Sequence, residues 1–297
     1  MGSFQWEVDF IAALQDKADE TLIWIMSAFS MLGEEMALVV IVGLLYLCYD
    51  KKMGRKLALG MLGGILGGEI IKSRVLRLRP YFSHSGILCL RAPSGGGDIM
   101  DLAVQGYSFP SMHSSNSVIM FGLLAVNSRK RWCRVIWLVF PLLIGFSRAF
   151  LGVHYPTDVM AGWLFGAIVL YAVLELTERT ENYLLICAVS CVLALPGWLI
   201  CGTRDFSSAY GLMVGMLLGF AFEDKLVRFE NTASFLRGAV RLISGLVLFF
   251  GLSSMLKMLL PENQIFRALR YALSSFAVMG VYPMVFKPMN RIWKSVK

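Results

Sequence analysis

The chain has 297 residues, of which 57% are hydrophobic and 16% charged, with a net charge of +8 and a mean hydropathy of +0.65. A soluble globular domain is roughly half apolar and a quarter charged, so this composition excludes an ordinary soluble fold and predicts an all-α, polytopic membrane helical bundle. A nucleic-acid partner is not expected despite the basic balance, because the bases follow membrane topology rather than forming one patch.

Residues 1–34 are predicted to form an interfacial amphipathic helical segment. Phe10, Ile11 and Leu14 recur at helical spacing among charged and polar residues, which is typical of a helix that lies in the membrane interface. The apolar piece over residues 21–32 continues this segment and is too short to cross the bilayer. The first residues contain acids and no base, so a removable signal peptide is not expected.

Nine apolar runs follow, and each is predicted to cross about 30 Å of hydrocarbon. The runs are residues 35–49, 55–74, 110–127, 133–151, 158–177, 183–202, 208–222, 240–260 and 267–286. Nine spans place the two termini on opposite sides of the membrane. Because cytoplasmic loops collect Lys and Arg, the favoured orientation has an extracytoplasmic or lumenal N-terminus and a cytoplasmic C-terminus.

Several bases stay on the extracytoplasmic side against this rule, which indicates that they have a task there. They are Lys72, Arg74, Arg77, Arg79, Arg91 and Arg148. At about 100° per residue Lys72 and Arg79 share a helix face. Arg74 and Arg77 point away from that face and are expected to contact lipid headgroups. Glu69 lies one turn before Lys72, either as a functional acid or as a charge that offsets Lys72.

The six cysteines form no CxxC pair and lie far from the histidines, so no metal site is predicted. Cys89 and Cys201 fall on the same predicted side of the membrane. Free thiols are favoured over a disulfide between them.

Three polar stretches lie at the extracytoplasmic ends of predicted spans. The first is residues 72–80, which read KSRVLRLRP; the second is residues 110–113, which read PSMH; and the third is residues 147–158. Enzymes stabilise a transferring phosphoryl group with fixed cations and N–H donors, and all three stretches supply such groups. The predicted phosphate-binding residues are Lys72, Arg79, Ser111, Met112 through its backbone N–H, and Arg148.

Two of the three histidines, His113 and His154, lie inside these stretches, whereas His84 lies outside them and is interpreted as interfacial. Asp158 follows His154 by four residues on the same helix face. Its carboxylate can therefore accept a ring N–H and leave the other ring nitrogen free to attack.

The three stretches resemble the signature K-x6-RP, PSGH and SR-x5-H-x3-D of the type 2 phosphatidic acid phosphatase family. Every polar position is present, and Met112 stands where glycine is usual, which is expected to narrow the space near the phosphate. The resemblance implies that His154 is the nucleophile, that Asp158 orients it and that His113 protonates the leaving oxygen. It also implies catalysis without a metal or another cofactor.

The expected function is a metal-independent membrane phosphatase that hydrolyses a phosphomonoester or diphosphate of a lipid through a phosphohistidine intermediate at the extracytoplasmic face. Residues 35–177 are the expected phosphatase core, and residues 178–297 add further membrane helices. The expected partners are a lipid phosphate substrate and membrane lipids, with no obligatory protein partner. Two alternatives stay open: a phosphatase of a soluble sugar phosphate, similar to the glucose-6-phosphatase branch, and a catalytically silent scaffold or transporter.

Overall fold

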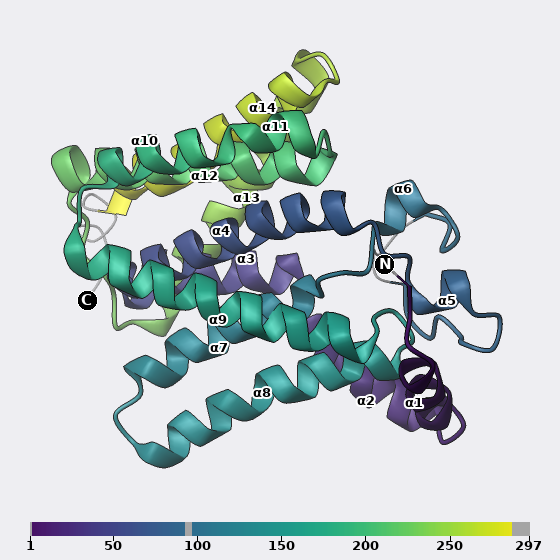
Figure 1. Ribbon diagram of the computed structural model, residues 1–297. Helices are drawn as coiled ribbons and strands as arrows, with labels where there is room; N and C mark the ends of the chain where they lie inside the picture. The colour runs from purple at the N-terminus through teal and green to yellow at the C-terminus, as the bar shows by residue number, and fades with distance from the viewer. Residues whose placement is uncertain (1, 93–96, 287–297) are drawn as a thin grey trace. The chain divides into compact units, whose positions relative to one another are not determined.

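A computed structural model of the chain describes residues 2–92 and 97–286, and every regular element among them is a helix (Figure 1). The all-α class is therefore confirmed. The α-helices are α1 (Gln5–Gln15), α2 (Glu20–Met31), α3 (Glu35–Leu44), α4 (Lys51–Val75), α5 (Pro80–Ser83), α6 (Leu102–Gln105), α7 (Met112–Asn127), α8 (Arg131–Phe150), α9 (Pro156–Arg179), α10 (Tyr183–Ala194), α11 (Pro196–Ile200), α12 (Arg204–Phe222), α13 (Phe235–Leu259) and α14 (Gln264–Phe276). Short π-helical turns, η1 (Leu45–Tyr49), η2 (Glu223–Val227) and η3 (Ala277–Val281), extend α3, α12 and α14, and a 3-10 turn, η4 (Tyr282–Val285), follows.

Two compact units divide the chain: residues 1–38 with 67–172, and residues 39–66 with 173–297. The predicted division into residues 1–34, 35–177 and 178–297 follows sequence order, whereas these units follow packing and group residues 39–66 with the C-terminal helices. The end of the predicted C-terminal region, residues 287–297, lies outside the described residues.

Helices α7, α8 and α9 pack together in the first unit (Figure 1). Gly162 of α9 approaches the backbone of α7 so closely that a Cβ there would lie 2.4 Å from the Ser111 carbonyl oxygen. Pro141 removes one backbone donor from the middle of α8, and its carbonyl oxygen accepts a hydrogen bond of 3.0 Å from the Trp163 indole of α9. These contacts hold α9 against α7 and α8, and the polar stretches lie at the ends of these helices.

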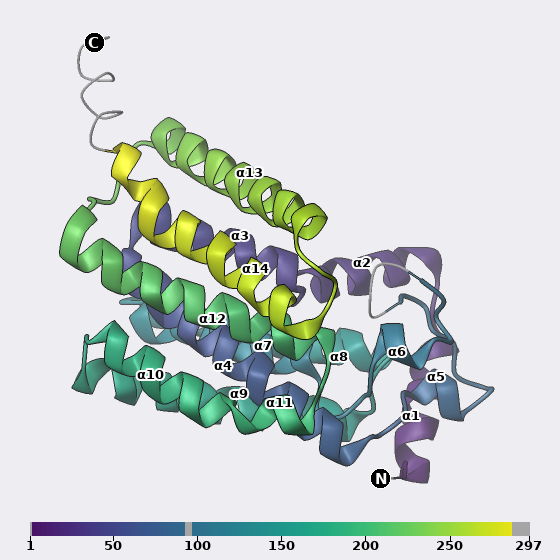
Figure 2. The same ribbon diagram turned by 90° about the horizontal axis from the view of Figure 1, so that it is seen from above.

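In the second unit α12 lies along α14 (Figure 2). Gly211 and Gly215 make this contact close, because a Cβ on either glycine would lie 2.1 Å from a carbonyl oxygen of α14. The buried Arg55 near the start of α4 bonds to the buried Glu223 and, at 2.8 Å, to Asp224, both in η2, which extends α12. Small residues thus let the helix backbones approach each other, as they do in membrane bundles.

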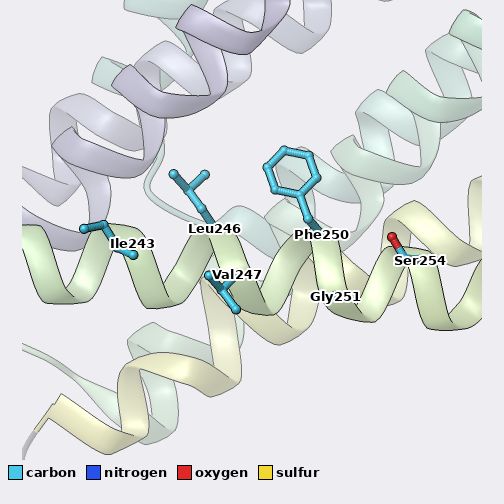
Figure 3. A pocket seen from close by; sticks show the side chains of 6 residues that line it. All are labelled: Ile243, Leu246, Val247, Phe250, Gly251 and Ser254. Carbon is cyan, nitrogen blue, oxygen red and sulfur yellow. The ribbon is translucent and has the colours of Figure 1, made fainter.

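Helix α13 carries a shallow apolar hollow on one side (Figure 3). All the lining residues come from this one helix: Ile243, Leu246, Val247, Phe250, Gly251 and Ser254. Only 6% of the apolar window of α13 is buried, which fits a helix whose side chains face lipid.

The number of nine spans is not confirmed. Among the described residues, five helices are long and apolar enough to cross a membrane, or six if α2 and α3 with η1, which meet at 49°, form one broken span. The five are Arg131–Phe150, Pro156–Arg179, Tyr183–Ile200, Arg204–Val227 and Phe235–Leu259. Helix α4 begins with several bases, α7 has only 16 residues with a polar first half, and the last expected span is divided between α14, η3 and η4.

The interfacial amphipathic segment is not confirmed either. Residues 1–34 form two separate helices, and α2 joins α3 as the bent pair. Glu7 and Ile11 of α1 are completely buried. Ile11 packs with Ile87 and Tyr155 beside the third polar stretch, so α1 packs into the first unit and brings a carboxylate with it.

Candidate active site

Arg79 is held rigidly beside the candidate nucleophile. Its guanidinium donates to the carbonyl oxygens of Gln105 at 2.7 Å, Gly106 at 3.0 Å and Val153 at 3.0 Å, and to Nε2 of His154 at 3.1 Å. No carboxylate is among these partners, so the guanidinium keeps a full positive charge toward the site. Fixed donors of this kind need no reorganisation when charge develops on a substrate.

The Arg79 contact also determines which nitrogen of His154 carries the proton. A guanidinium can only donate, so Nε2 accepts and Nδ1 carries the hydrogen. Burial, together with the positive charges of Arg79, Arg148 and Lys72, holds the pKa of His154 well below its ordinary value. The ring is therefore neutral at pH 7, and Nε2 presents its lone pair on the side of the cations.

The sequence predicts a direct hydrogen bond between Asp158 and His154, and the structure does not contain it. Oδ2 of Asp158 lies 3.7 Å from Nδ1, beyond hydrogen-bond range. Ser108 fills the gap: its hydroxyl lies 3.4 Å from Nδ1 and donates a short hydrogen bond to Oδ2. The backbone N–H of Tyr155 donates to the same oxygen at 2.8 Å. The carboxylate therefore acts on the imidazole mainly through the Ser108 hydroxyl.

The prediction that Arg77 contacts lipid headgroups is wrong. Its side chain is 1% exposed and bonds to Asp158 at 2.5 Å and to Glu7 of α1 at 2.6 Å. Helix α4 ends at Val75, and the next residue, Leu76, has a φ of 50°. A right-handed helix cannot continue through a residue with a positive φ. The face arithmetic of a continuous helix therefore fails at Arg77. Arg74, inside the helix, is exposed, and its contact with lipid headgroups stays a prediction.

Arg148 and His113 bring buried side-chain nitrogens that have no hydrogen-bond partner in the part of the chain that the structure describes. Arg148 is fully buried and bonds to the Ser30 hydroxyl of α2, while its Nε and Nη2 have no hydrogen-bond partner among the described residues. Within the same described part, Nε2 of His113 is buried and also without a partner. Buried polar groups left unpaired by the protein are costly. Together with the cations beside them, these nitrogens suit an anionic group as ligand.

Ser111 and Met112 begin helix α7 beside this cluster. The Ser111 hydroxyl caps the helix: it accepts from the Ser114 backbone at 3.4 Å and from the Ser114 hydroxyl at 2.9 Å, and keeps its own proton to donate. The first backbone N–H groups of a helix have no partner within it and attract anions. The Met112 side chain lies against Gly68 of α4, where a Cβ would be 2.1 Å from its sulfur.

Lys72 lies 3.2 Å from Glu69, so the interpretation of Glu69 as a charge that offsets Lys72 agrees with the structure. The positive charge of Lys72 still acts on both His113 and His154. Burial lowers the pKa of Arg79 to about 10, which leaves this cation charged at neutral pH. The cations predicted from the sequence and both histidines thus belong to one electrostatic cluster in the first unit.

The described ranges contain no group of three or more His, Cys, Asp or Glu side chains that could hold a metal ion. Metal independence stays a prediction. The six cysteines are free thiols, as favoured.

Two family models match the chain: the PAP2 superfamily over residues 54–181, and the PAP2 superfamily phosphatase, transmembrane extension, over residues 207–291. The first match contains every residue of the three polar stretches, and the second covers most of α12 together with α13 and α14. The chain belongs to the PAP2 superfamily.

Two relatives of known name share between a quarter and a third of the aligned residues with this chain, over about half of its length. The undecaprenyl-diphosphatase of Sulfolobus acidocaldarius is 28% identical over 150 residues, 50% of this chain and 66% of that protein. The phosphatidylglycerophosphatase B of Bacillus subtilis is 27% identical over 172 residues, 54% of this chain and 77% of that protein. The crystal structure of Aquifex aeolicus LpxE aligns with a TM-score of 0.48 and 21% identity, over 58% of this chain and 97% of that chain.

The predicted site of this PAP2 protein does not include four residues that the structure places in contact with the predicted site residues or with one another: Glu7, Ser30, Arg77 and Ser108. Ser108 lies two residues before Pro110, so its place next to the second stretch is the one local signal among them. Glu7 and Ser30 come from the N-terminal helices, and their contacts with Arg77 and Arg148 depend on tertiary packing. No local pattern marks either residue.

Proposed function

We propose that this chain is a metal-independent membrane phosphatase that hydrolyses a lipid phosphate or diphosphate through a phosphohistidine intermediate at the extracytoplasmic face. The observation that carries the proposal is a set of buried side-chain nitrogens on Arg148 and His113 that have no hydrogen-bond partner among the described residues, in the same cluster as His154, the proposed nucleophile. Such a set suits a phosphoryl group, whose charge spreads over its equatorial oxygens during transfer.

In the first step Nε2 of His154 attacks phosphorus while the bond to the leaving oxygen breaks. The developing charge on the equatorial oxygens is stabilised by Arg79, Arg148 and Lys72. The imidazole becomes positively charged as the bond forms, and Asp158 stabilises that charge through the Ser108 hydroxyl. The leaving oxygen takes a proton, and the candidate donor is His113 in its protonated, charged form, which the negative charge of the bound phosphate favours.

In the second step water attacks the phosphohistidine. His113, now without its proton, accepts a proton from that water, and the N–P bond breaks as inorganic phosphate forms. Nε2 recovers its lone pair, so the site returns to its starting state. Arg79 then donates again to the free nitrogen, which fixes the tautomer for the next cycle.

A lipid substrate is supported by two observations. Relatives carry the names undecaprenyl-diphosphatase, phosphatidylglycerophosphatase B and lipid A 4'-phosphatase. Each is the name of a phosphatase and includes the name of a phosphorylated lipid as its substrate. The predicted topology puts the polar stretches at the ends of spans, where a headgroup can enter while its chains stay in hydrocarbon. The same topology, based on the distribution of Lys and Arg, supports the extracytoplasmic face.

Lipid phosphates are expected to be hydrolysed with a higher kcat/KM than a soluble sugar phosphate. Each buried CH₂ of an acyl chain contributes about 0.8 kcal/mol of membrane partition, a term that a sugar phosphate lacks. Phosphate release from phosphatidic acid, phosphatidylglycerophosphate, a polyprenyl diphosphate and glucose 6-phosphate, measured in one detergent, tests this. A glucose 6-phosphate rate constant above all three lipids would assign the soluble substrate instead.

Activity is expected to be unchanged in excess EDTA and to be strongly inhibited by vanadate. The fixed cations Lys72, Arg79 and Arg148 already neutralise the phosphate, and vanadate can adopt the five-coordinate geometry of the transferring group. Phosphate release from the best lipid substrate is measured with EDTA, with EDTA plus excess magnesium, and with vanadate. Loss of activity in EDTA that magnesium restores would contradict the metal-independent mechanism.

A further inference from the structure

Glu7 of α1 is a buried carboxylate in the active-site region. It is 0% exposed and accepts four hydrogen bonds: from Arg77 at 2.6 Å, from the Thr157 hydroxyl at 2.5 Å, from the Thr157 backbone at 3.2 Å and from the Phe4 backbone at 2.9 Å. A buried charge persists only with such compensation. Residue 7 is 150 positions before Thr157 in the chain, so this contact ties the N-terminal helix to the start of α9.

Arg77 joins Glu7 to Asp158. One end of its guanidinium, Nη1, donates to Asp158 at 2.5 Å and to the Thr157 hydroxyl at 2.7 Å, and the other, Nη2, donates to Glu7. The guanidinium also lies over the ring of Tyr155, 4.0 Å from its centre. One planar cation thus holds two buried carboxylates in a fixed geometry, which a lysine ammonium cannot reproduce.

On the basis of the proposed phosphatase function, we infer that Glu7 and Arg77 are positioning residues of the active site. They hold Asp158, and through Ser108 the imidazole of His154, in the orientation required for attack. The path of contacts runs from Glu7 to Arg77, to Asp158, to Ser108 and to Nδ1 of His154. The N-terminal helix α1 is therefore a working part of the site, although it lies outside the three polar stretches and outside the matched range 54–181.

Charge distinguishes this role from a purely structural one. The charged and titratable groups that act on His154 are the cations of Arg79, Arg148 and Lys72, the imidazole of His113, and Asp158 with the Arg77–Glu7 pair behind it. Loss of the Glu7 charge leaves more positive charge near the imidazole, so protonation of His154 requires a lower pH. Loss of the Arg77 charge has the opposite effect.

The test measures kcat/KM against pH for the full-length wild-type protein and its variants in detergent, with p-nitrophenyl phosphate as substrate. The quantity compared is the acid limb, the pH range in which kcat/KM falls as His154 becomes protonated. Glu7→Gln should move the limb to lower pH and Arg77→Gln to higher pH, each by about half a pH unit. Asp9→Asn, a neutralised exposed acid on the same helix, and Arg74→Gln, a neutralised exposed base, are matched controls and should leave the limb in place.

Arg77→Lys keeps the positive charge but loses the forked guanidinium, so kcat should fall about tenfold. The acid limb should stay at its wild-type pH, and KM should stay within about twofold of the wild-type value. This variant decides the question if either neutral variant does not fold. The inference is overturned if folded Glu7→Gln and Arg77→Gln keep the wild-type limb, or if Arg77→Lys keeps the wild-type kcat. Absence of any turnover by the wild-type protein would instead overturn the proposed function.

Discussion

Replacement of His154 by alanine is expected to abolish hydrolysis of every phosphate ester, activated or not. Without the imidazole no phosphoenzyme forms, and the remaining cations still bind phosphate but offer no nucleophile. The expected loss is at least about 10⁴-fold in kcat, by analogy with removal of a nucleophile in other covalent mechanisms. Initial rates on a lipid phosphate and on p-nitrophenyl phosphate measure the loss.

His84→Ala is the matched control for this change, because His84 lies outside the cation cluster and bonds to Ser3 at 3.0 Å. This variant should keep wild-type activity. A His154→Ala protein that retains activity on p-nitrophenyl phosphate, with a normal elution profile, would show that the nucleophile is another group.

Replacement of His113 by alanine is expected to give a loss that depends on the leaving group. An alkoxide is a poor leaving group and needs a proton, whereas p-nitrophenolate leaves readily without one. General acid catalysis is typically worth about 10² to 10⁴-fold. His113→Ala should therefore lose about that factor on an alkyl lipid phosphate and keep a much larger share of its kcat/KM on p-nitrophenyl phosphate.

Trapping of the intermediate separates the two histidines. Phosphohistidine is stable in base and labile in acid, so the label from a radioactive aryl phosphate can be recovered under alkaline quench. We expect label in the His113→Ala protein and none in the His154→Ala protein. The reverse result would exchange the two roles.

The motif positions were predictable because each stretch is short and stays near the end of a helix. The N-cap at Ser111 and the close spacing of His154 and Asp158 both come from local backbone geometry. The pattern of charged residues also predicts a task for Arg79 and Arg148. The packing of α7, α8 and α9 places Arg148, whereas the bonds of Arg79 to backbone carbonyls of other segments place Arg79.

The parts that the sequence did not predict depend on contacts between distant segments. Arg77 turned inward because the helix stops at Val75, and the positive φ of Leu76 is not marked by a glycine or asparagine. Glu7 belongs to the segment 1–34, which is predicted from the sequence to lie in the membrane interface, and no local pattern predicts its burial. Its burial depends on Arg77 and Thr157, more than 60 residues away in the chain. The count of nine spans is not confirmed for a different reason, since hydropathy does not show where a helix bends or breaks.

The contact between Met112 and Gly68 makes these two positions depend on each other. The Met112 sulfur occupies the volume that a β-carbon on residue 68 would need, at 2.1 Å. A chain with glycine at position 112 leaves that volume empty, whereas here a β-carbon at position 68 requires the flexible end of the Met112 side chain to move to another rotamer. The effect of a substitution at Gly68 therefore depends on which residue stands at position 112. The departure from the family signature at Met112 thus couples the packing of α4 to the start of α7.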